Sequence, residues 1–363
     1  MSKVKSMFGN YADRLQVMID ASLDKFAPTW FQKYFDWGTP QTTLNYVSVI
    51  GKSRIEAAAS VVDRDSPAPL RSRAALDKLT GEIPAISEKF KMTENDYYDF
   101  LTLQSLQSID DATKRTQLLD LMFGDVKKAG AAPLKRLDIM TLQAISTGKI
   151  VISSTTNPDG LAMDDIDLLM PSGNKVNAAT VWSNTASNPL TVDIPGIINA
   201  ATARGIKFSK MLMSRAKWYE FIKITEVKSY ISNFLGFKTA GNVLVTLENV
   251  NKIMEANMWP LIEIVDEAIG VEADGVITTI RPFADANVAF IPDGKLGTIK
   301  NTVAIEQIKP VEHVNYATYQ RVLISKWGET DPFGEWTKGS INAFPAVEAI
   351  DSIYLLSTTA SFS

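Results

Sequence analysis

The chain has 363 residues, of which 45% are hydrophobic and 21% charged, and its formal net charge is -4. This composition is typical of a folded protein with room for two cores, and it excludes a disordered chain. The absence of cysteine excludes disulfides, the single histidine, His313, excludes His-pair metal motifs, and the mildly acidic balance argues against a dedicated nucleic-acid-binding protein.

The N-terminus has no targeting or membrane segment. Lys3 and Lys5 are not followed by an apolar stretch, so we expect no signal peptide. No window of the chain approaches the roughly 18 apolar residues that a membrane span needs. The sequence therefore predicts a protein that is made and stays in a cytoplasm.

Residues 1–42 predict an arm rather than a domain. Six aromatic side chains crowd around Pro28, namely Phe26, Trp30, Phe31, Tyr34, Phe35 and Trp37. So many large apolar side chains beside a terminus need a surface to cover. Two interpretations stay open: the aromatics fold back on the chain's own core, or they pack on a neighbouring copy.

Residues 43–92 predict an extended loop made of strands and a charged tip. Leu44–Ile50 alternates like a half-buried strand, and Asp63–Pro69 has turn chemistry. The loop carries one basic cluster, which consists of Arg64, Arg71, Arg73 and Lys78. The cluster either keeps an exposed tip soluble or forms salt bridges to an acidic patch on an adjacent subunit.

A long helix over residues 109–147 is the dominant predicted element. Thr93 and Asp96 cap a shorter helix before it. Apolar residues then recur at three- and four-residue steps, and Gly148 is a C-terminal stop signal. At about 1.5 Å per residue the whole stretch would be roughly 58 Å long. Pro133 lies inside it, so we expect a bend there.

After the long helix the pattern becomes mixed. We expect a strand pair around Asn157–Gly160 and a polar boundary at Ser183–Pro189. Asp193 and Pro195 open a helix that ends near Gly205. Ser214 caps a helix that carries Trp218, Phe221, Ile222 and Ile231, and Thr246 caps another through Met254. Strands are expected at residues 206–213, 261–265, 275–280 and 287–291, and the tail from Gln320 to Leu356 is mostly extended.

Catalytic motifs are weak or absent. There is no glycine-rich nucleotide loop, and Gly294–Gly297 reads as a turn. The S-x-x-K pattern occurs four times without its companion motifs, and Ser214 is better explained as a helix cap. Asp164, Asp165 and Asp167 could hold a divalent cation, but their spacing does not fit a calcium-binding EF-hand loop. We therefore assign no catalytic, cofactor-binding or metal-binding residue.

Taken together, the order of these parts resembles the major capsid protein of tailed bacteriophages, and most closely the lambda protein E family. The most specific stretches are APLRSRAALDKLTGEIPAISEKFKMTENDY (68–97), LDIMTLQAISTGKI (137–150) and FADANVAFIPDGKLGT (283–298). The resemblance implies the α+β tailed-phage capsid fold, which herpesviruses share. Its parts would be an N-terminal arm (1–42), an extended β-hairpin loop (43–92), a peripheral domain with the spine helix (93–190), an α/β axial domain (191–320) and an extended return to the peripheral domain (321–363).

The resemblance also implies a function and partners. The chain would be a structural protein that self-assembles through pentamers and hexamers into an icosahedral head around double-stranded DNA, without sequence-specific binding. Its partners would be itself, a scaffold, a portal and a decoration protein, and it would reach the virion after assembly in the cytoplasm of the bacterial host. Inter-subunit contacts are expected at Trp30, Phe31, Phe35, Trp37, Arg64, Arg71, Arg73 and Lys78.

Two alternatives differ in function class. The first is a shell protein of the same fold that encloses an enzyme cargo rather than DNA. The second is a metal-dependent enzyme that uses Asp164, Asp165 and Asp167.

Overall fold

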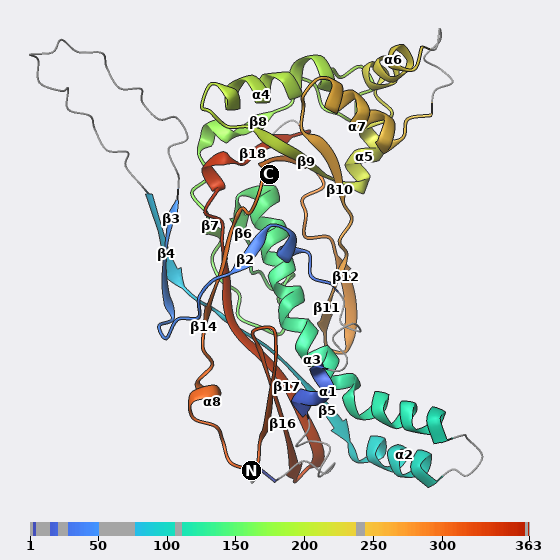
Figure 1. The fold of residues 1–363 in the computed structure, drawn as a ribbon, viewed down its shortest axis with the longest axis vertical. Helices are drawn as coiled ribbons and strands as arrows, with labels where there is room; N and C mark the ends of the chain where they lie inside the picture. Colours follow the sequence, from blue (N-terminus) through green and yellow to red (C-terminus); the bar gives the residue numbers. More distant parts are fainter. Residues whose placement is uncertain are drawn as a thin grey trace, which may run out of the picture. The chain divides into compact units, whose positions relative to one another are not determined.

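A computed structural model describes residues 3–4, 15–20, 28–50, 77–105, 111–236, 244–359 and 362. Its contacts divide the chain into two compact units, each built from three separate segments. Unit 1 comprises Met1–Tyr46, Gly81–Asp138 and Ile299–Pro345, and unit 2 comprises Val47–Thr80, Ile139–Thr298 and Ala346–Ser363. Both units mix helices and strands, as the sequence predicted (Figure 1).

The sheet of unit 1 has seven strands. Its main path runs β1 (Lys3–Val4), β16 (Val322–Thr330), β17 (Phe333–Ala346), β14 (Gly297–Thr302) and β2 (Phe35–Trp37). In addition, β15 (Asn315–Tyr319) pairs with β16, and β5 (Ala85–Thr93) pairs antiparallel with β17. The extended tail that the sequence predicted thus supplies the long strands of this sheet, whereas β14 was not predicted.

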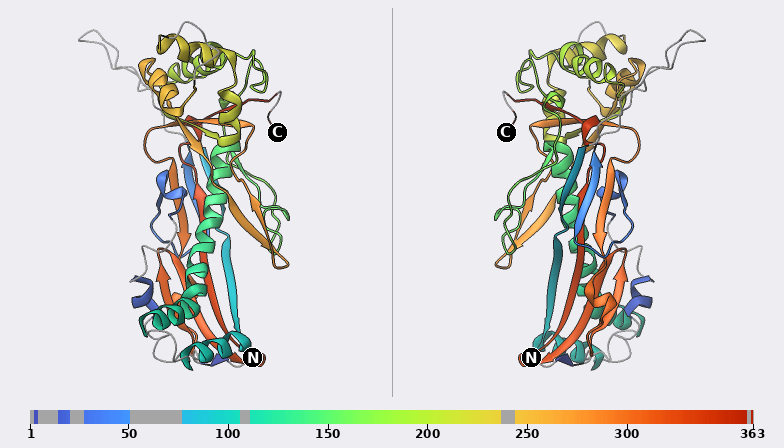
Figure 2. Two further views of the ribbon diagram at one scale, coloured as in Figure 1. Left: turned by 90° about the vertical axis from the view of Figure 1, so that its right-hand side faces the viewer. Right: turned by 90° about the vertical axis from the view of Figure 1, so that its left-hand side faces the viewer.

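Helix α3 (Asp111–Thr147) is the long helix of the prediction. Its apolar stripe is buried at Val126, Ala129, Leu137 and Met140. The helix ends where Gly148 adopts a φ of +73°, a conformation that favours glycine. Figure 2 shows a change of direction in the N-terminal part of α3. The bend that we expected at Pro133, which lies inside the helix, stays a prediction.

The structure describes part of the predicted loop 43–92, whose role as an extended loop stays a prediction. Strand β3 (Asn45–Ile50) pairs with β4 (Asp77–Glu82). Tyr46, Ser48 and Ile50 are buried and the residues between them are exposed, which is the expected alternation. The predicted tip, with Arg64, Arg71 and Arg73, lies outside the described residues.

The sheet of unit 2 has five strands in the order β10 (Leu261–Val265), β9 (Phe208–Ser214), β13 (Asn287–Pro292), β18 (Tyr354–Ser357) and β8 (Lys175–Asn177). The pairs β10–β9 and β18–β8 are parallel, and β13 runs antiparallel to both its neighbours. Figure 1 shows α4 (Ile194–Thr202), α6 (Thr225–Phe234) and α7 (Leu247–Ala256) on one side of this sheet. Their apolar faces and the sheet form one buried core.

Local signals located these helices well, with one correction. The Ser214 hydroxyl accepts a hydrogen bond from the Lys217 N–H, and the Thr246 hydroxyl accepts one from the Asn249 N–H, so both predicted caps are confirmed. The predicted helix from Ser214 to Ile231 is two helices, α5 (Arg215–Phe221) and α6, separated by a turn at 222–224. No glycine or proline marks that turn. The expected strand pair is β6 (Lys149–Ile150) with β7 (Ile166–Asp167).

Within the described ranges, we found no helix with the length and hydropathy of a membrane span.

Candidate assembly surfaces

The aromatic arm packs inside its own chain. Trp30, Phe31 and Phe35 are each at most 3% exposed, and Tyr34 is buried beside Trp30 with ring centroids 5.2 Å apart. Trp37 is half-buried and meets the Phe31 ring edge-on at 5.5 Å. Trp30, Phe31 and Phe35 thus cover the core of their own chain in this conformation, and their expected contact with a neighbouring copy stays a prediction. Phe26 lies outside the described residues.

Asp138 anchors this arm to α3. Its Oδ1 accepts a hydrogen bond of 2.9 Å from the Phe31 N–H, and its Oδ2 lies 3.3 Å from the Lys135 Nζ. The side chain is fully buried, where a carboxylate is tolerated only with such partners. The sequence analysis missed Asp138. The available signal was an acidic residue between the apolar Leu137 and Ile139.

Lys78 is the one member of the basic cluster that the structure describes. It is exposed on β4. Strand β3, its pairing partner, exposes Val47 and Val49 at 60% and 46%. The described base of the loop therefore presents exposed apolar residues together with a cation, a combination that suits contact with another protein surface.

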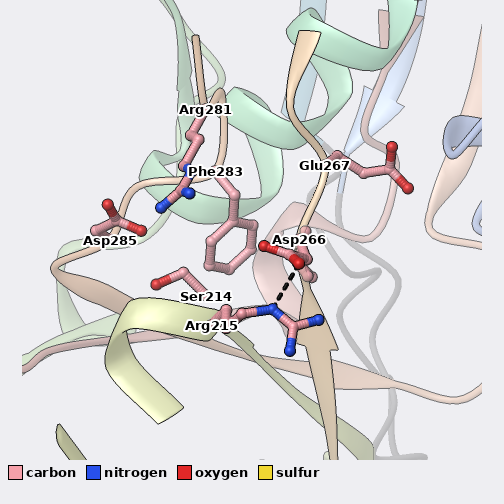
Figure 3. A pocket seen from close by; sticks show the side chains of 8 residues that line it. Ser214, Arg215, Asp266, Glu267, Arg281, Phe283 and Asp285 are labelled. Carbon is pink, nitrogen blue, oxygen red and sulfur yellow. Dashed lines mark hydrogen bonds and ion pairs between the residues drawn. The ribbon is translucent and has the colours of Figure 1, made fainter. Parts of the chain in front are cut away.

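A charged pocket lies at the C-terminal ends of the parallel strands β9 and β10 (Figure 3). Arg215 Nε donates to Asp266 Oδ2 at 2.5 Å, and this hydrogen bond raises the pKa of the guanidinium. Figure 3 shows the Phe283 ring among the charged side chains. Val265, Arg281, Glu267 and Asp285 complete the lining, and none of these last three has an ion-pair partner among the described residues.

The chemistry of this pocket does not suggest catalysis. Ser214 faces it, but the Ser214 oxygen is used as the cap of α5. Charges of both signs surround one apolar ring, whereas a phosphate or nucleotide site would concentrate positive charge and free backbone N–H groups. The pocket fits contact with charged side chains of another protein surface better than a cofactor.

The aspartates of the metal hypothesis do not converge. Asp164 and Asp165 are exposed, and Asp167 Oδ1 accepts a hydrogen bond from the Leu169 N–H. The described part of the chain holds no group of three acidic, histidine or cysteine side chains placed to bind a metal ion. His313 is exposed, with Nε2 3.7 Å from Glu312 Oε1.

Exposed apolar residues occur in several further places. Met258 is 92% exposed beside α7, and Ile305 and Ile308 are 69% and 59% exposed on the short helix α8 (Ile305–Ile308). Val276 and Ile277 are 65% and 69% exposed on β12 (Val276–Ile280). A single exposed aliphatic residue needs no explanation, but neighbouring ones mark surfaces that other molecules cover.

One protein family and several solved structures are similar to this chain. A family model described as phage major capsid protein E matches residues 21–357. The crystal structure assigned to a prophage capsid protein of E. coli CFT073 is similar over 98% of this chain and 99% of its own, with 14% identity and a TM-score of 0.59. A phage-related protein from Bordetella bronchiseptica RB50 covers 99% and 98% of the two chains, with 11% identity and a TM-score of 0.47. No curated protein sequence matches.

Proposed function

The chain belongs to the phage major capsid protein E family, and we propose that its copies assemble through pentamers and hexamers into an icosahedral head that encloses double-stranded DNA. The observation that carries this proposal is the family match, which spans residues 21–357 of 363. The protein is accordingly a structural shell subunit that associates with copies of itself.

Each segment has a proposed role in the shell. Residues 43–92 are the loop that lies on a neighbouring subunit, and residues 93–190 are the peripheral domain. Residues 191–320 are the axial domain near the capsomer centres, and residues 321–363 return to the peripheral domain. Support for an α/β domain in residues 191–320 comes from the core that α4, α6 and α7 form with β9, β10 and β13, although β8 and β18 of the same sheet come from outside that range.

The proposed inter-subunit contacts centre on the basic cluster. We assign Lys78, Arg64, Arg71 and Arg73 to salt bridges with an acidic patch of the next subunit. Among the described aromatics of the arm, the half-buried Trp37 has surface left for contact with a neighbouring subunit. Trp30, Phe31 and Phe35 would contribute only if the arm left its own core during assembly. Exposed charge pairs of this kind set register more than affinity.

The interior of the head is proposed to hold DNA without reading its sequence. A net charge of -4 supports this, because a strongly basic chain would bind the phosphate backbone tightly. A scaffold, a portal and a decoration protein are the further partners that we propose, with assembly in the bacterial cytoplasm before the chain becomes part of the virion.

The first test is expression of the full chain, followed by size exclusion and negative-stain electron microscopy. Closed shells or pentamer and hexamer rings are the expected result. A stable 39.9 kDa monomer, alone and after co-expression with a scaffold from the same genome, would contradict the proposal. Nuclease-protected DNA inside particles from a phage infection would support the proposed contents. A protein cargo in its place would favour the alternative in which the shell encloses an enzyme.

A further inference from the structure

Strands β11 (Ile269–Ala273) and β12 form a two-stranded hairpin that no other described strand extends (Figure 1). Its turn is Asp274–Gly275, and both residues have positive φ values, 50° and 78°. That combination is typical of the type I′ turn, which fixes the register of a hairpin. Near its base, Ile269 and Val271 pack with Ile139 and Ile280 in a small apolar cluster.

Beyond this base the described part of the chain leaves β12 exposed. Val276 through Thr279 are all exposed, and the strand VITTI contains β-branched residues only, with no charge and no proline. Such a strand has high β propensity and presents an unpaired row of N–H and C=O groups along its outer edge. An isolated two-stranded hairpin is marginally stable in water, so a third strand would stabilise it.

The register decides which backbone groups face outward. Ala273 pairs with Val276 next to a two-residue turn, so these two form a hydrogen-bonded pair and the pairs alternate from there. Val276, Thr278 and Ile280 therefore use their backbone groups inside the hairpin. The N–H and C=O groups of Ile277 and Thr279 point away from β11 and are the groups that a further strand would bind.

We infer that β12 pairs antiparallel with β12 of a second copy of this chain, about a two-fold axis at Thr278. Ile277 then lies opposite Thr279 of the second copy and exchanges both hydrogen bonds with it. Val276 lies opposite Ile280, so all five residues of the strand are paired. The inference rests on the proposed function, because a shell brings many copies of one chain together.

Charge explains why the strand pairs with itself. An isologous contact places like residues near each other, so it tolerates a charged strand poorly. Strand β12 has no charged residue, whereas Glu272 lies on β11 and Asp274 in the turn. In the four-stranded sheet the two β11 strands occupy the outer positions. Their two Glu272 side chains are therefore separated by both β12 strands.

The absence of cysteine allows a direct test by crosslinking. Directly opposite residues of a non-hydrogen-bonded pair have Cα atoms about 4.5 Å apart, within the range that a disulfide spans. Assembled Thr278→Cys particles should form disulfide-linked dimers under mild oxidation. The matched control is Val276→Cys, whose two copies would lie about 14 Å apart, four residues at roughly 3.4 Å each. Crosslinking at both positions, or at neither in intact particles, overturns the inference.

A second pair of variants tests the hydrogen bonds. Thr279→Pro removes an outward N–H from β12 and leaves the ladder to β11 intact, and Glu272→Pro does the same on the other edge. We expect Glu272→Pro to assemble normally and Thr279→Pro to give few particles, or particles that dissociate at lower temperature. Equal assembly of the two variants would refute self-pairing of β12. If the unmodified chain forms no particle, the proposed function fails first, and that result is distinguishable from the failure of either variant.

Discussion

The buried carboxylate of Asp138 accepts a hydrogen bond from the Phe31 N–H, 107 residues earlier in the chain, at 2.9 Å. This bond attaches the aromatic arm to the long helix and satisfies a backbone donor that the surrounding rings shield from water. The arm is thereby part of the folded subunit.

Removal of this acceptor should destabilise the chain. Asp138→Ala leaves a buried N–H without a partner, which costs about 1–3 kcal/mol of unfolding free energy. Asp138→Asn keeps an oxygen at the same place and should lose clearly less. Urea denaturation of the two variants and the wild type measures both values. Equal losses in the two variants would show that the hydrogen bond to Phe31 contributes little.

Close packing between α3 and β17 gives a second prediction. A Cβ added to Gly339 would collide with the carbonyl oxygen of Ala129, a backbone atom that cannot move aside. Gly339→Ala should therefore lower the unfolding free energy by about 1–3 kcal/mol, as measured by thermal or chemical denaturation. The control is Gly124→Ala on α3, the helix that carries Ala129, where the added Cβ meets nothing within 4 Å. Gly124→Ala should raise the unfolding free energy by up to about 1 kcal/mol. A similar loss in both variants would contradict the collision with Ala129 as the cause.

The phenol of Tyr46 gives a prediction at high pH. Burial raises its pKa from 10.0 to about 12, and its ring stacks on Phe344 at 5.1 Å. Because the folded state holds the proton more tightly, the associated stability is complete below pH 10 and is lost as the pH rises toward 12. Tyr46→Phe should flatten the decline of unfolding free energy between pH 10 and 12. An unchanged slope in that interval would contradict this assignment.

The capping box of α2 (Glu94–Ser105) gives a prediction at low pH. The Thr93 N–H and hydroxyl both donate to Asp96 Oδ2 at 2.7 Å and lower the pKa of that carboxyl. Because the pKa of Asp96 is lowered in the folded state, its carboxylate stabilises the folded state at pH values above the ordinary pKa of 3.8. This contribution is lost as the pH falls below that value. Thr93→Ala should lower the unfolding free energy by about 0.5–2 kcal/mol at pH 7 and by less below pH 3.

A threonine on the same helix provides the control for the cap. The Thr102 hydroxyl donates to the Tyr98 carbonyl, one turn earlier. Thr102→Ala should change the unfolding free energy by no more than about 0.5 kcal/mol at either pH. A similar loss from both alanine variants would show that Thr93 acts through general helix propensity rather than as a cap.

The sequence predicted the helix caps and the helix stop that depend on residues close together in the chain. The caps at Thr93, Ser214 and Thr246 were found because each depends on a bond to a residue three positions away. The stop at Gly148 was found because few other residues favour its positive φ. The capsid family was found from longer stretches of sequence, and the family match confirms it.

What the sequence left open depends on distant pairings. The burial of Phe31 requires Asp138, and nothing near either residue indicates the other. Strand β14 is polar at Lys300, Asn301 and Thr302, so only its place in the sheet of unit 1 makes it a strand. The exposed edge of β12 could not be predicted either, because the sequence VITTI predicts a strand but does not indicate whether a neighbouring strand pairs with it.

The order of strands in both sheets has a consequence for synthesis on the ribosome. Strand β18 is made after β8 and β13 but lies between them, and β17 is made after β5 and β14 but lies inside the sheet of unit 1. Neither sheet can close until these late strands have left the exit tunnel. A chain truncated by a stalled ribosome thus lacks an internal strand and cannot mature into a competent subunit, so incomplete copies are withheld from the growing shell before any partner meets them.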